Sequence, residues 1–87
     1  MLHELKILPI FFEPLKSNQK KFEVRKNDRP FKVGDEILFR ELHPNHRQGF
    51  ELEVKYSSEI CHRKISYILS DFEGIERGFC VLGLENL

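Results

Sequence analysis

The segment from Lys20 to Arg29 carries the residue types and the spacing best suited to chemistry. In an extended strand, residues two apart share one face, so Lys21, Glu23 and Arg25 are predicted to form a single polar row. A carboxylate between two cations orients the guanidinium, and an oriented arginine grips phosphate with two hydrogen bonds or reads the edge of a base. Lys20 directly precedes the row and is expected to reach the same cleft. The alternative is an ordinary lattice of ion pairs on a solvated sheet face, which stabilises little.

Other catalytic and metal-binding patterns are missing from the sequence. It has no Gly-x-Gly-x-x-Gly or Walker-type phosphate loop, and no Gly-x-Ser-x-Gly nucleophile elbow. His43 and His46 are three apart, a spacing that can bind zinc on a helix. Pro44 and Asn45 predict a turn there instead, and no third ligand is nearby. We therefore expect neither a metal nor a cofactor.

Apolar and polar residues alternate with a period of two along most of the chain, which predicts strands. Within residues 21–26, Phe22 and Val24 are expected to face the core. Pro9 ends the first strand, and the apolar residues after it predict one short helical segment that ends near Asn18. Turns or loops are expected at residues 27–30, 33–35, 43–49 and 70–74, the last with the option of a single helical turn, and a turn or a bulge is expected at residues 57–59. The expected strands cover residues 2–8, 21–26, 36–42, 50–56, 60–69 and 79–84.

About six short strands leave sheet edges exposed unless the sheet curls and closes. We therefore predict a mainly β (α+β) fold, a small β-barrel with one short helix after the first strand. In the longest strand, Ile65, Tyr67 and Leu69 are expected on one side. Cys61 and Cys80 are too few and too far apart for a disulfide framework, and are predicted to be reduced, partly buried strand residues.

Length and composition limit the classes of function. The chain has 87 residues, of which 40% are hydrophobic and 32% charged, and this is typical of one folded domain over residues 1–87. The net charge is zero, which argues against a domain that coats nucleic acid non-specifically. Residues 16–32 are nevertheless basic, so a local positive field is expected. No signal peptide or membrane-spanning run is evident, and we expect a cytoplasmic protein without a membrane partner.

Five stretches of the sequence together resemble one known family. They are HELKILP (residues 3–9), FEVRKNDR (22–29), VGD (33–35), YILSDF (67–72) and VLG (81–83). The set is similar to a small ASCH-like family of the PUA-like superfamily, whose members are short stand-alone bacterial and phage proteins of mostly unassigned function. The resemblance covers nearly the whole chain, and FEVRKNDR is its specific part. It implies a PUA-like β-barrel, with RNA or another nucleotide-containing ligand as the partner.

The resemblance also implies which residues form the site. ASCH domains carry a motif similar to Gly-x-Lys-Thr-x-Glu-x-Arg after the first helix, lining a cleft proposed to bind RNA. On this chain the motif positions are occupied by Asn18, Lys20, Lys21, Glu23 and Arg25. A branch of ASCH domains hydrolyses acetylated cytidine, using the motif lysine and a threonine placed where Glu23 stands. This chain has no threonine, so a hydroxyl nucleophile does not carry over.

These observations predict an RNA-binding module with a basic cleft after the first helix. Arg25, fixed by Glu23, is expected to give selectivity, and Tyr67 to stack a base. An alternative is a small amidohydrolase acting on a modified nucleoside such as acetylated cytidine, with Lys20 and Glu23 as the working pair. A third is a protein-interaction module whose exposed barrel edge recruits a partner strand. The predicted nucleic-acid-binding residues are Lys20, Lys21, Glu23, Arg25, Lys26, Arg29 and Tyr67.

Overall fold

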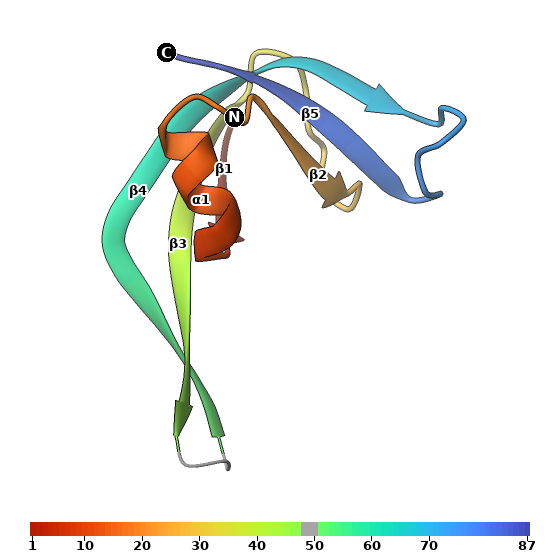
Figure 1. Cartoon of the computed structure of the whole chain (residues 1–87). Helices are drawn as coiled ribbons and strands as arrows, with labels where there is room; N and C mark the ends of the chain where they lie inside the picture. Colours follow the sequence, from red (N-terminus) through yellow and green to blue (C-terminus); the bar gives the residue numbers. More distant parts are fainter. Residues whose placement is uncertain (48–50) are drawn as a thin grey trace.

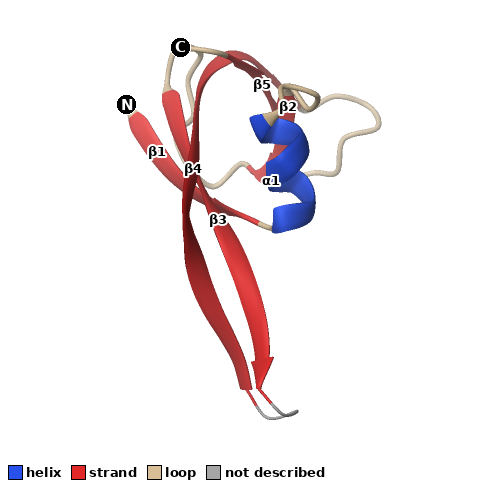
Figure 2. Ribbon diagram, turned by 60° about the vertical axis from the view of Figure 1, so that its left-hand side comes forward, coloured by secondary structure: helices blue, strands red, loops and turns tan. Residues whose placement is uncertain are grey.

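The computed structural model describes residues 1–47 and 51–87, and the side chains of residues 1–42 and 59–87. Five strands form one mixed sheet in the order β1-β3-β4-β5-β2, in which β1 runs parallel to β3 and the other neighbours are antiparallel. The sheet curls into a half-barrel, and the helix α1 follows the first strand (Figures 1 and 2). The elements are β1 (Leu2–Ile7), α1 (Pro9–Lys16), β2 (Phe22–Lys26), β3 (Glu36–Arg47), β4 (Glu51–Ser70) and β5 (Phe79–Glu85). The predicted mainly β fold is thus confirmed, with five strands instead of about six.

The helix α1 is short because its sequence limits it at both ends. Pro9 stands at its start, where a missing N–H costs nothing. Phe12 and Leu15, three residues apart, are its fully buried side chains. Asn18 then adopts φ 64°, the left-handed conformation that asparagine tolerates, and turns the chain away. The expected end near Asn18 is confirmed. The helix has eight residues, and nothing helical in the described chain has the length and apolar character of a membrane span.

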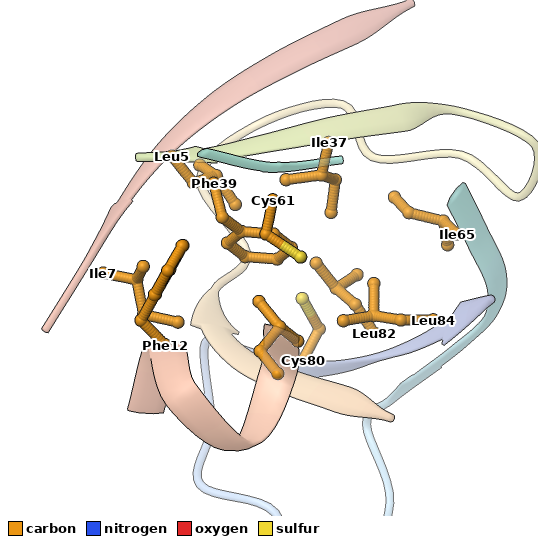
Figure 3. Close-up of a cluster of buried hydrophobic side chains, with 11 residues drawn as sticks. Leu5, Ile7, Phe12, Ile37, Phe39, Cys61, Ile65, Cys80, Leu82 and Leu84 are labelled. Atoms are coloured by element: carbon orange, nitrogen blue, oxygen red, sulfur yellow. The ribbon is translucent and has the colours of Figure 1, made fainter. Parts of the chain in front are cut away.

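The core lies between the inner face of the sheet and α1 (Figure 3). It is a single small cluster, as expected for a chain of this length. Both cysteines belong to it as free thiols in strands, as predicted, but they are buried and not partly buried. Burial raises the pKa of both thiols. Among residues 1–42 and 59–87, the buried hydrophobic residues are Leu5, Ile7, Phe12, Leu15, Ile37, Phe39, Cys61, Ile65, Cys80, Leu82 and Leu84.

The strands β3 and β4 form a hairpin longer than the sequence predicts. The expected loop over residues 43–49 is wrong for residues 43–47, which continue β3 in register with β4. Of the turn or bulge expected at residues 57–59, the bulge is confirmed, because β4 runs unbroken from Glu51 to Ser70 while its register with β3 shifts between Tyr56 and Ile60. A change of register between Arg40 and Leu42 lets the ladder continue past this point. Two expected strands are therefore one, which accounts for the lower strand count.

Two strands present a different face from the one expected. In β2, Phe22 and Val24 are exposed while Glu23 is 5% exposed, so the expectation that the apolar pair faces the core is wrong. In β4, a bulge lies between Ile65 and Tyr67. It turns Ile65 into the core and leaves Tyr67 outside, so these residues do not share one side.

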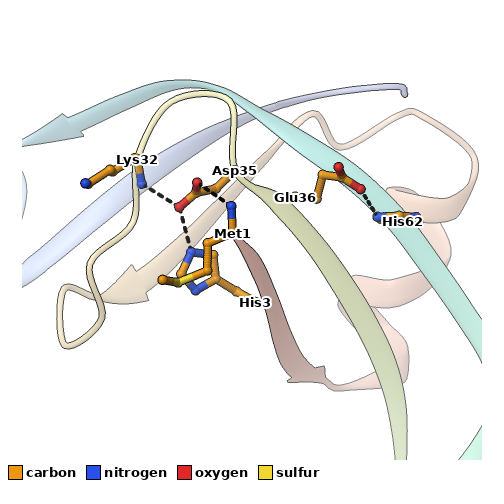
Figure 4. A network of polar contacts seen from close by, with 6 residues as sticks. All are labelled: Met1, His3, Lys32, Asp35, Glu36 and His62. Carbon is orange, nitrogen blue, oxygen red and sulfur yellow. Dashed lines mark hydrogen bonds and ion pairs between the residues drawn. The ribbon is translucent and has the colours of Figure 1, made fainter.

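A polar network ties β1 to the turn before β3 (Figure 4). The carboxylate of Asp35 lies 2.8 Å from Nε2 of buried His3 and accepts from the Lys32 backbone N–H at 3.0 Å and the Met1 amino group at 3.1 Å. The His3 contact, with the other two, lowers the pKa of Asp35 to about 2. Gly34 supplies φ +95° for the predicted tight turn beside it, which is confirmed.

Candidate functional site: a basic hollow between the edge strands

The turn that follows α1 positions Lys20. Once Asn18 has reversed the chain, the backbone N–H of Lys20 donates to the carbonyl of Pro14 at 2.8 Å. Ser17 is held on the same turn of helix, because its hydroxyl and backbone N–H donate to the carbonyls of Pro14 and Glu13. These bonds bring the Lys20 side chain over the start of β2.

Lys20, Glu23 and Arg25 meet in one ion-paired cluster. The ammonium of Lys20 contacts Oε1 of Glu23, and Nε of Arg25 donates to Oε2 at 2.8 Å. Both carboxylate oxygens therefore have a cationic partner, which explains how Glu23 tolerates burial on the inner side of β2. Two cations face one carboxylate, so the cluster retains one positive charge for an incoming ligand.

The cluster lines a hollow of about 410 Å³. Its other walls come from the end of β1, from α1 and from β2. Phe11 and Phe22 flank the ammonium of Lys20, whose Nζ lies 5.3 and 5.5 Å from the two ring centroids. A volume of this size lies within the range of small-molecule sites, about 300–1,000 Å³. The lining residues are Lys6, Ile7, Leu8, Phe11, Lys20, Phe22, Glu23, Val24 and Arg25.

Two arginines bridge the seam between β1 and β2, the edge strands of the half-barrel. Nη2 of Arg25 donates to the Lys6 carbonyl at 2.5 Å, and Nη1 of Arg29 donates to the Glu4 carbonyl at 3.2 Å. The two carbonyls are two residues apart and so lie on the same side of β1. Side chains thus span the gap that a backbone ladder would close in a full barrel.

A second, smaller hollow of about 170 Å³ lies along the same seam. Arg25 lines both hollows and separates them. The smaller one has three cations and one carboxylate in its wall, which favours an anionic occupant. Its lining residues are Leu5, Arg25, Lys26, Asp28, Arg29 and Phe31.

The structure brings together most of the residues predicted for the site. Lys20, Glu23 and Arg25 line the larger hollow, and Lys26 and Arg29 line the smaller one. Two predicted residues lie elsewhere. Lys21 is exposed and lines neither hollow, and Tyr67 is on the outer face of the sheet, two strands away from β2.

Sequence reasoning missed the aromatic walls. Phe11 is one of the apolar residues after Pro9 that predict a helix face, and Phe22 is predicted to face the core, because large apolar residues are usually buried. Both are close to half exposed, at 47% and 48%. A usable signal is the pair Phe11-Phe12, because adjacent residues on a helix point about 100° apart and a short helix does not bury both equally.

Among the residues whose side chains are described, no three histidines, cysteines or carboxylates gather as a metal site would require. The side chains of His43 and His46 lie outside the described ones. The turn expected between them is wrong, since Pro44 and Asn45 pair with β4 as part of β3.

The fold and the hollows define a small mainly β domain whose open seam carries a basic, aromatic-walled pocket. Over residues 2–84 the chain matches the model of a family described as Domain of unknown function (DUF3850), and it belongs to that family. No curated protein matches the chain.

Proposed function

We propose that this domain binds RNA by holding one nucleotide unit across the two hollows, with the base in the larger and a phosphate in the smaller. The observation that carries the proposal is the position of Arg25. It lines both hollows and is oriented from two sides, by Glu23 and by the Lys6 carbonyl. A fixed guanidinium between an aromatic pocket and a cationic one suits a ligand with a planar and an anionic part.

The larger hollow suits a base because it combines flat apolar surface with a few directed polar groups. Phe11 and Phe22 offer ring faces for stacking, which is how proteins hold unpaired bases. Lys20 and Arg25 supply N–H donors beside them, and the net positive charge favours ring nitrogens and carbonyl oxygens as acceptors. The lining therefore offers apolar surface for the faces of a base and donors for its edge.

The smaller hollow suits a phosphate. Lys26 and Arg29 stand in its wall with Arg25, and Asp28 offsets one of the three charges. Lys21 lines neither hollow, but it is exposed and directly precedes β2, where it adds positive charge for a neighbouring phosphate. These lysines supply affinity that is independent of sequence and sensitive to salt, whereas Arg25 supplies selectivity.

The resemblance to the ASCH-like family of the PUA-like superfamily supports the same proposal. The half-barrel with one helix after the first strand agrees with the fold that the resemblance implies. Lys20, Glu23 and Arg25 stand at the positions of the ASCH cleft motif and line one hollow. We therefore propose an ASCH-like assignment for this DUF3850 domain.

Fluorescence anisotropy with a short labelled single-stranded RNA at low salt tests the proposal. Lys26→Gln should weaken binding of all sequences and reduce the slope of log K against log salt by about 1. Lys16→Gln is the matched control, because Lys16 is an exposed lysine paired with Glu59 and lines neither hollow. Affinity no greater than that of a neutral control protein, or equal losses in the two variants, would refute the proposal.

Hydrolysis of a modified nucleoside remains the second candidate because Lys20 and Glu23 touch inside a ligand-sized hollow. The arrangement favours binding over this chemistry, since an amine attacks as the free base and Glu23 already accepts from two cations. Incubation with acetylated cytidine, followed by chromatography, decides between them. Deacetylation that disappears in Lys20→Ala would replace the binding proposal with an enzymatic one.

A further inference from the structure

The outer face of the sheet carries a row that no part of the pocket uses. Phe22 on β2 pairs with Gly83 on β5, and Gly83 pairs with Tyr67 on β4. Directly paired residues project to the same face. Phe22 is 48% and Tyr67 64% exposed, so two aromatic side chains stand in the open on either side of a glycine.

The bulge in β4 is what places Tyr67 in this row. Ile65, two residues earlier, is fully buried on the inner face. The register shift between Ile65 and Tyr67 inserts Ser66 as an extra residue, and the strand changes face there. An aromatic ring is thus turned to solvent by a specific backbone feature.

Gly83 stands between the two aromatic residues and has no side chain of its own. Their Cα atoms are two strand spacings apart, about 10 Å. A Cβ on Gly83 would lie 3.4 Å from the Cβ of Tyr67 and 3.1 Å from the Ser66 hydroxyl, so a side chain here would occupy the space beside the tyrosine. The close approach of Ser66 and Tyr67 at the β4 bulge accounts for glycine at this position, and it leaves no Gly83 side chain between the two aromatic rings.

This row continues directly into the pocket. Phe22 belongs to it and also lines the larger hollow. The adjacent row on the same face is apolar and consists of Val24, Val81 and Leu69. Lys26 follows Val24 along β2. None of the seven residues in these two rows and at Lys26 is a carboxylate. An apolar, aromatic surface flanked by a cation suits unpaired bases on a phosphate backbone.

We propose that Tyr67 stacks the base adjacent to the one held in the larger hollow, with the strand passing over Phe22 and Gly83. The ligand is then single-stranded nucleic acid with at least two consecutive unpaired nucleotides, and a free nucleotide fills only part of the site. This inference rests on the proposed binding of a nucleotide unit, and it adds the class of partner and a second contact surface.

The test compares a mononucleotide, cytidine monophosphate, with a short single-stranded oligocytidine by calorimetric titration. Tyr67→Ser should weaken the binding of the oligonucleotide roughly tenfold, since loss of one stacked base has about this effect. The affinity for the mononucleotide should not change. Phe72→Ser is the matched control, because Phe72 is 60% exposed and lies outside the row. Because the chain has no tryptophan, Tyr67→Trp adds a unique reporter, whose fluorescence should be quenched by the oligonucleotide and not by the mononucleotide.

The outcomes separate the two proposals. If both ligands bind with equal affinity and Tyr67→Ser changes neither, the stacking surface is refuted and the pocket stands. If neither ligand binds, the proposed function fails and the inference fails with it. If Tyr67→Ser instead abolishes a concentration-dependent dimer seen by sedimentation and leaves oligonucleotide affinity unchanged, the face is an interface between copies of the chain, and the inference is overturned.

Discussion

Replacing Glu23 with glutamine tests whether the ion-paired cluster organises the pocket. Glu23→Gln keeps the size of the side chain and removes its charge. Lys20 and Arg25 would then share a neutral amide, whose oxygen can accept from one of them while its NH2 group faces the other. Two cations would be left close together at the edge of the core.

The magnitude follows from burial. Removing one partner of a fully buried ion pair costs roughly 3–5 kcal/mol. The side chains of Lys20 and Arg25 are 15% and 26% exposed, so water compensates part of the loss and we expect about 2–3 kcal/mol. For a domain of this size, about 4–8 °C of melting temperature corresponds to each kcal/mol, so the midpoint should fall by roughly 10–20 °C.

Thermal and urea unfolding followed by circular dichroism measures this change. Glu59→Gln is the control, because the Lys16–Glu59 pair is about half exposed on both sides and such pairs contribute about 0–1 kcal/mol. The double variant Lys20→Met/Glu23→Gln should recover part of the loss, since it removes one unpaired cation. If Glu23→Gln and Glu59→Gln lower the midpoint equally, Glu23 does not hold a buried cluster and the argument for an oriented Arg25 fails.

Three further predictions concern the rest of the fold. The pKa of Asp35 lies at about 2 in the folded state against an ordinary 3.8, so its carboxylate stabilises the fold above pH 3.8. This contribution is lost as the pH falls toward 2. Asp35→Asn should therefore flatten the dependence of the unfolding free energy on pH between these values, and an unchanged slope would contradict the prediction. Burial raises the pKa of Cys61 and Cys80, so both should react with a thiol reagent far more slowly in native protein than in denaturant, and equal rates would place them at the surface. Phe12 is fully buried, so Phe12→Ala should cost roughly 3–5 kcal/mol in urea unfolding, and a loss below about 1 kcal/mol would mean that α1 does not close the core.

The elements predicted best are those bounded by residues with special backbone preferences, such as proline, asparagine and glycine. Pro9 and Asn18 bracket α1, and Gly34 marks the turn before β3, because each residue restricts or permits specific backbone angles. The hairpin of β3 and β4 was predicted too short. Pro44 and Asn45 are turn residues by local preference, yet they lie in β3, where pairing with β4 decides the conformation.

Most residues of the site were predicted from the sequence, but the face of β2 that points inward was not. Alternation correctly separated Glu23 and Arg25 from Phe22 and Val24, but a period of two does not say which row faces inward. In an ordinary strand, the more apolar row of side chains faces inward. Here β2 is an edge strand beside a hollow, and Lys20 arrives from the preceding turn to neutralise an inward carboxylate. That contact depends on the path of the chain after α1, which local sequence does not specify.

The arginines across the seam also protect this protein against aggregation through its open sheet edge. An open sheet edge is a template on which foreign or identical chains can assemble into aggregates. Arg25 and Arg29 occupy two carbonyl oxygens of β1 that an added strand would need as acceptors, and they bring charge to the place where it would dock. Recruitment of a partner strand along this edge would first have to displace two guanidinium groups. The side chains that shape the pocket thereby block addition of a strand to the edge of the half-barrel. A full barrel prevents the same addition by closing its sheet.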